Sequence, residues 1–165
     1  FAPAKHGLVA EGKFKGRPLV LLKSNTFMNL SGKALCYWQQ QYKLPPNQLL
    51  VITDDLALPP MHLRLKTKGG SGGHNGLSHI EETLQSQAYA RLRFGIGKDF
   101  PPGGQSDYVL GPWAASEKAL LPKAIETAAK ACLDFCFMGP ERTMNWVNGW
   151  KPETSEETSS DLGGS

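Results

Sequence analysis

A glycine-rich segment at residues 69–76 carries the most distinctive chemistry of this 165-residue sequence. Five of its eight residues are glycine, and it includes His74 and Asn75. Glycine at this density costs folding entropy, so it indicates unusual backbone geometry or close approach to a ligand. The spacing fits neither GxxxxGK[ST] nor GxGxxG, which argues against a nucleotide-binding loop. Backbone N–H groups at the start of a following helix are suited to a polar or anionic ligand.

Two further polar segments interrupt apolar runs. The segment Thr53-Asp54-Asp55 ends the apolar run at 49–52. The Asp54 carboxylate there either orients a nearby base or ends the strand as a turn residue. Asn29 precedes a helical apolar stripe. Its side chain either holds the substrate through its amide or caps the helix, and the same two interpretations apply to Asn75. We expect the side chains of Asn29, Asp54 and Asn75 to line one cleft.

Basic side chains flank the glycine segment. They are Lys66, Lys68, Arg91 and Arg93. Arg91 and Arg93 share one face of an extended segment, which suits a phosphate clamp or a solvated basic edge strand. The net charge is +3, although residues 151–165 hold four acids and one lysine, so the remainder is more basic than the total suggests. This balance is compatible with a nucleic-acid partner and also with an ordinary soluble protein.

The hydrophobic pattern predicts alternating strands and helices. Strands are expected at 7–13, 18–23, 48–53, 62–67 and 90–96, and helices at 30–43, 76–85, from Pro122 to Met138, and at 141–148. This order predicts a layered α/β sheet with sites at loops beyond strand ends. One domain is expected at 1–150, followed by a disordered tail at 151–165.

Composition argues against several classes of protein. The three cysteines, Cys36, Cys132 and Cys136, form no CxxC pair and suggest buried thiols in a reducing compartment. No secretory signal is present, and no apolar run approaches the ~20 residues of a membrane span. We therefore expect a cytoplasmic protein that does not contact a membrane.

Four motifs taken together resemble the bacterial peptidyl-tRNA hydrolase family. They are Phe27-Met28-Asn29-Leu30-Ser31-Gly32-Lys33-Ala34, Asp54-Asp55-Leu56 with Leu58-Pro59, Gly72-Gly73-His74-Asn75-Gly76-Leu77, and Arg91-Leu92-Arg93 with Gly95-Ile96-Gly97. Each is weak alone, but their order and spacing match over about residues 5–148. The resemblance implies a single-domain, three-layer α/β/α fold with a mixed sheet. It also implies a monomeric esterase that cleaves peptidyl-tRNA without a metal or other cofactor.

The resemblance also implies a role for particular residues. Asp54 would hydrogen-bond a histidine that activates water, and His74 would shape the pocket. Asn29 and Asn75 would hold the substrate, and Phe27 and Met28 would contact the peptide. Lys66 and Arg93 would clamp a phosphate. The catalytic set would thus be Asp54, His74 and Asn75.

One part of the family pattern has no counterpart. The Gly-Asn-Pro-Gly and Thr-Arg-His-Asn stretches, the second of which supplies the base, match nothing between Phe1 and Ser165. We therefore expect a chain that begins some tens of residues into the fold and cleaves peptidyl-tRNA poorly, because a base must lie about 3 Å from its water. The alternative is a non-catalytic RNA-binding relative of the same fold, similar to intron-splicing factors of plant organelles.

Overall fold

The structure, a computed structural model, describes residues 1–153. The tail predicted from residue 151 therefore lies almost entirely outside the described residues. The strands are β1 (Ala2–Ala4), β2 (Gly7–Phe14), β3 (Arg17–Ser24), β4 (Leu50–Asp55), β5 (Leu63–Lys66) and β6 (Ala90–Gly95). The α-helices are α1 (Ser31–Gln41), α2 (Asn75–Leu84), α3 (Gln105–Leu110), α4 (Ala115–Met138) and α5 (Pro140–Val147), and the short 3-10 helices are η1 (Met28–Leu30) and η2 (Pro46–Gln48).

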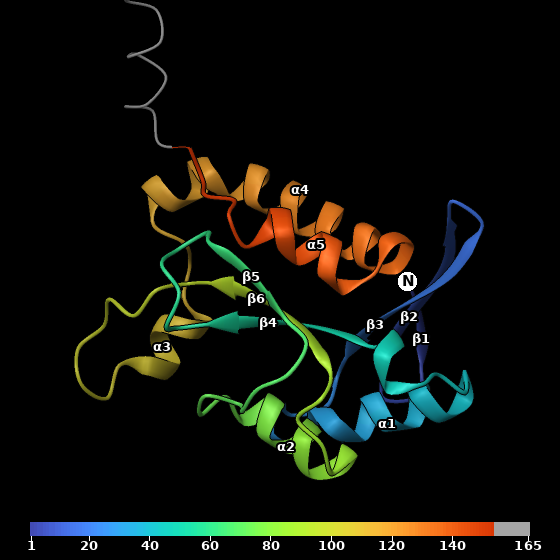
Figure 1. Cartoon of the computed structure of the whole chain (residues 1–165). Coiled ribbons are helices and arrows are strands. Elements are labelled where there is room, and N and C mark those ends of the chain that lie inside the picture. Colours follow the sequence, from blue (N-terminus) through green and yellow to red (C-terminus); the bar gives the residue numbers. More distant parts are fainter. Residues whose placement is uncertain (154–165) are drawn as a thin grey trace, which may run out of the picture.

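The described strands form two three-stranded sheets. In the first, β1, β2 and β3 are antiparallel neighbours in chain order. In the second, β6 lies between β4, to which it is parallel, and β5, to which it is antiparallel. Helices α4 and α5 cover one face of this second sheet, while α2 and α1 lie on the other side (Figure 1). The predicted three-layer α/β/α fold with a mixed sheet is confirmed.

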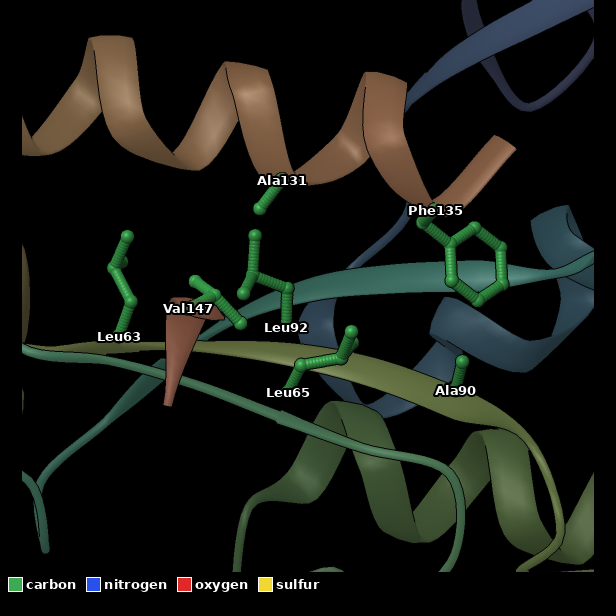
Figure 2. Close-up of a cluster of buried hydrophobic side chains, with 7 residues drawn as sticks. All are labelled: Leu63, Leu65, Ala90, Leu92, Ala131, Phe135 and Val147. Carbon is green, nitrogen blue, oxygen red and sulfur yellow. The ribbon is translucent and has the colours of Figure 1, made fainter. Parts of the chain in front are cut away.

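The main core lies between the second sheet and the pair α4–α5. Side chains alternate across a strand, so the apolar residues of β5 and β6 all face these helices. Figure 2 shows the buried cluster, which consists of Leu63, Leu65, Ala90, Leu92, Ala131, Phe135 and Val147. Cys132 and Cys136 pack against it but are half-buried and not fully buried as predicted. Burial raises the pKa of Cys132 to about 11.

The sequence pattern locates the major elements but misplaces some boundaries. The five predicted strands and four predicted helices all occur, while β1 and α3 were not predicted. The long helix begins at Ala115, not near Pro122, because the Glu117 carboxylate accepts a hydrogen bond from the Ala114 N–H at 2.9 Å and caps an earlier turn. The alternative of a basic edge strand at 90–96 is wrong, because β6 is the central strand.

No helix within residues 1–153 combines the length and apolar character that crossing a membrane requires. 

The backbone at the end of β6 packs closely against the loop that precedes β5, and this contact positions the strand ends beside the candidate site. Gly95 exchanges backbone hydrogen bonds with His62 and Met61, at 2.8 and 2.9 Å. A Cβ atom at Gly95 would lie 2.1 Å from the Pro59 carbonyl oxygen. The loop 56–62 is therefore held against β6 by backbone, which cannot move aside as a flexible side chain can.

We predict that Gly95→Ala destabilises the protein by about 3 kcal/mol, because overpacking at this point displaces backbone. The midpoint of urea unfolding should fall at constant m-value. Gly12→Ala is the matched control, since nothing lies within 4 Å of a Cβ at that strand position. A Gly95 variant as stable as the Gly12 variant would show that loop 56–62 packs more loosely than described.

Candidate functional site

His74 joins the carboxyl end of β4 to the start of α2. Its Nε2 lies 2.9 Å from Asp54 Oδ1 and 3.0 Å from Thr53 Oγ1. Its Nδ1 accepts hydrogen bonds from the backbone N–H groups of Gly76 and Leu77, at 3.1 and 3.2 Å. Because Nδ1 accepts, the proton of the neutral ring is on Nε2, which donates to Asp54.

The hydrogen bond from His74 lowers the pKa of Asp54 and outweighs the opposing effect of burial. Asp54 is therefore held as a carboxylate at neutral pH. His74 is also the N-cap of α2, so the possibility that Asn75 caps this helix is wrong. Asn75 is instead the first helical residue, with an exposed side chain.

The segment carrying Asn29 packs against the same helix start. The Ser31 hydroxyl donates to the Met28 carbonyl oxygen at 2.7 Å and tightens the turn of η1. Met28 lies over Gly76, where a Cβ would come within 2.7 Å of Met28 Sδ. The alternative that Asn29 caps α1 is wrong, because the N-cap position belongs to Leu30 and no side chain caps there. Within residues 1–153, the side chains of Asn29 and Asn75 form no hydrogen bonds, so both amides are free for a ligand.

A groove of about 610 Å³ opens beside this cluster. Its polar end includes Thr53, Asp54 and His74, and Met28 also contributes to its wall. The rest is largely apolar and formed mainly by side chains of β3, α1, β4 and α2. Asn29 and Asn75 lie next to wall residues in the sequence but do not line the groove, and Phe27 is 81% exposed. Convergence of both asparagines with Asp54 in one cleft stays a prediction.

The second sheet has a basic face on the side opposite the main core. Pairing of β5 with β6 sets Arg64 opposite Arg93 and Lys66 opposite Arg91. All four side chains share a face because residues two apart along a strand, and residues directly opposite, point the same way. Sequence analysis missed Arg64, which the alternation around Leu63 and Leu65 would have revealed.

The two arginines of β6 are occupied within the protein. Arg91 is fully buried, pairs with Glu81 at 3.3 Å and lies 3.9 Å over the Tyr89 ring. Burial there raises the pKa of Tyr89 to about 12. Arg91 cannot reach a phosphate in solution, so the interpretation of Arg91 as part of a clamp is wrong.

Arg93 is less buried but also engaged. Its guanidinium lies 3.4 Å from Asp55 Oδ2 and donates to the Gly70 carbonyl oxygen at 3.1 Å. Arg91 donates to the same carbonyl at 3.4 Å. The two arginines therefore fix the glycine segment against the sheet. Lys66 is exposed and has no acidic partner within residues 1–153.

Comparison with known proteins gives the family of this chain. The sequence model of the family described as "Peptidyl-tRNA hydrolase" matches residues 2–157. The chain belongs to the peptidyl-tRNA hydrolase family. The resemblance seen in the four motifs is thereby confirmed.

Individual relatives show how far the similarity extends. A peptidyl-tRNA hydrolase of Cytophaga hutchinsonii is 54% identical over 87% of this chain and 77% of its own length. One of Parabacteroides distasonis is 49% identical over 90% and 79% respectively. The crystal structure of a peptidyl-tRNA hydrolase from Acinetobacter baumannii superposes with a TM-score of 0.82, at 34% identity, over 90% of this chain and 75% of that one.

We predict that His74→Asn raises the pKa of Asp54, because the asparagine retains a cap acceptor but loses the ring donor. A carboxyl-carbon NMR titration of Asp54 measures this, with His62→Asn as a control that leaves the value unchanged. Because the pKa of Asp54 is lowered in the folded state, its ionised carboxylate stabilises the fold at pH values above the ordinary aspartate pKa of ~3.9. This contribution is lost as the pH falls through the lowered pKa of the folded protein.

His74→Ala should additionally lose the helix cap and unfold about 1 kcal/mol more easily than His74→Asn at neutral pH. Chemical denaturation of the two variants side by side measures the difference. Equal stability of the two would show that the Nδ1 contacts with Gly76 and Leu77 contribute little.

Proposed function

We propose that this protein hydrolyses the ester bond between peptide and tRNA in peptidyl-tRNA. The observation that carries the proposal is the Asp54 carboxylate, held ionised by His74 at the polar end of a groove. We propose that the exposed amides of Asn29 and Asn75 act at this centre and hold the ester carbonyl. Water would add to that carbonyl, and the tRNA 3′ hydroxyl would leave with a proton.

We further propose that His74 positions Asp54 and is not the base that activates water. Its Nδ1 has two N–H donors and its Nε2–H is donated to Asp54, so no ring lone pair is free. The other histidines are engaged elsewhere: His79 accepts from Gly32, His62 contacts the Pro60 carbonyl, and His6 packs edge-on against Tyr37.

The family resemblance implies that the base would belong to a Thr-Arg-His-Asn stretch, which has no counterpart between Phe1 and Ser165. Two features are compatible with such a segment. The groove beside Asp54 has room for an added side chain, and Phe1 itself lies on its wall. Asp54 would then orient an imidazole and stabilise its protonated form during the reaction.

Hydrolysis of an N-acetylated aminoacyl-tRNA tests this proposal in two proteins. One is residues 1–165, and the other joins to Phe1 the corresponding amino-terminal segment of the Cytophaga hutchinsonii relative. We expect the longer chain to cleave roughly 10²- to 10⁴-fold faster, the usual contribution of a general base. In that chain, Asp54→Asn should lower kcat by a larger factor than the factor by which it changes KM.

The outcomes separate the alternatives. Full turnover by residues 1–165 would show that the base lies within this sequence. Tight tRNA binding without cleavage by either protein would contradict the hydrolase proposal and favour the RNA-binding alternative. Loss of both binding and cleavage in folded protein would contradict both.

We also propose that Lys66, together with Arg93, contacts a phosphate of the tRNA near the ester. Lys66 supplies an exposed cation on the basic face, whereas Arg93 also holds the Gly70 carbonyl oxygen. Phosphate contacts position a nucleic acid without reading its sequence. The two side chains should therefore behave differently when removed.

Lys66→Ala should weaken binding of all tRNAs and lower the slope of log affinity against log salt by about 0.7 to 0.9. Cleavage of a short ester lacking tRNA should be unchanged in the longer chain. Arg93→Ala should impair both substrates, because it also releases the glycine segment. Lys123→Ala, at an exposed position on α4, is the control. An unchanged salt slope in Lys66→Ala would remove that residue from the clamp.

A further inference from the structure

A histidine outside the catalytic set links the two segments that carry the site asparagines. The Gly32 backbone N–H donates to His79 Nδ1 at 2.9 Å, across 47 residues of sequence. Gly32 lies in the first turn of α1, where N–H groups lack partners within the helix. Since no side chain at Leu30 caps this helix, the imidazole on α2 satisfies the N–H instead.

The two helices approach closely at this point. A Cβ on Gly32 would lie 2.4 Å from Thr83 Oγ1 and 2.6 Å from the His79 carbonyl oxygen. Gly32 is fully covered, whereas His79 is half-buried. The separation of α1 and α2 is therefore set by direct contact between the Gly32 backbone and the His79 residue.

The contact lies one helical turn from the site asparagines. Asn75 and His79 are four residues apart in α2 and so share a helix face. Asn29 comes three residues before Gly32, within η1, which continues directly into α1. Met28, packed over Gly76, forms a second tie between the same segments. Along the chain the two ties lie on either side of Asn29, and on α2 both come within four residues after Asn75.

We propose that His79 is a positioning residue that sets the distance between the Asn29 and Asn75 amides through its bond to the Gly32 N–H. The inference rests on the proposed function, in that the two amides act together on one ester carbonyl. His79 itself does not touch the substrate. Loss of its acceptor atom lets η1 move relative to α2 and misaligns the pair when charge develops on the carbonyl oxygen.

Two substitutions separate the acceptor from the bulk of the side chain. His79→Asn places Oδ1 at the same number of bonds from Cβ as Nδ1, so it retains the acceptor. His79→Leu fills similar space without one. His62→Leu is the matched control, because it removes a half-buried histidine on the loop before β5.

Steady-state kinetics in the longer chain should show a split between kcat and KM. We expect His79→Leu to lower kcat about tenfold, the usual effect of losing one hydrogen bond's free energy, with KM within about twofold. His79→Asn should retain both constants within about twofold, as should His62→Leu. Equal kcat in His79→Leu and the parent would overturn the proposal, as would a folded His79→Asn that loses as much as His79→Leu.

An independent spectroscopic measurement keeps the inference separate from the hydrolase proposal. In ¹⁵N-labelled residues 1–165, the Gly32 amide nitrogen and His79 Nδ1 should show scalar coupling through the hydrogen bond. If this coupling is present and the parent fails to cleave peptidyl-tRNA, the hydrolase proposal fails while the contact stands. If the coupling is absent from folded protein, the positioning inference is wrong whatever the activity.

Discussion

The arrangement of the site depends on one imidazole that uses both of its nitrogens. His74 accepts from the first turn of α2 through Nδ1 and donates to Asp54 at the end of β4 through Nε2. The cap fixes the tautomer, and the tautomer provides the proton that Asp54 accepts. A helix start and a strand end are thereby held together, and the same bond keeps the carboxylate ionised. The glycines before His74 allow the chain to enter this geometry.

The sheet beneath the site combines an apolar face with a basic one. Burying the Arg91 guanidinium requires compensation, because an uncompensated buried charge is strongly destabilising. Glu81, the Tyr89 ring and backbone carbonyls of residues 70, 87 and 89 provide it. Two of these groups are the carbonyl of Gly70 in the glycine segment and the carboxylate of Glu81 in α2. The interactions that compensate the buried charge of Arg91 therefore also hold in place the glycine segment that contains His74.

Sequence alone predicted most of the fold and the family. Strand alternation, the proline and glycine boundaries and the four motifs were sufficient for the element order and the family. The partners of side chains were not predictable, because they depend on contacts between distant residues. Nothing in the Arg91-Leu92-Arg93 spacing reveals that β6 is central, and therefore that Arg91 is buried. Nor does the spacing tell which of His74 and Asn75 caps α2, since asparagine is the more usual cap.

Two of the motifs contain a glycine whose N–H donates to an imidazole, Gly32 in the first and Gly76 in the third. A Cβ on Gly76 would lie 3.0 Å from His74 Cε1, and a Cβ on Gly32 would lie 3.0 Å from His79 Nδ1. In each case an imidazole accepts a hydrogen bond from the glycine's own N–H. Glycine weakens a helix by roughly 0.5 to 1 kcal/mol relative to alanine. That loss is tolerated at both helix starts because a side chain would meet closer neighbours as well as the imidazole. These neighbours are Met28 Sδ, 2.7 Å from a Cβ on Gly76, and the His79 carbonyl oxygen, 2.6 Å from a Cβ on Gly32.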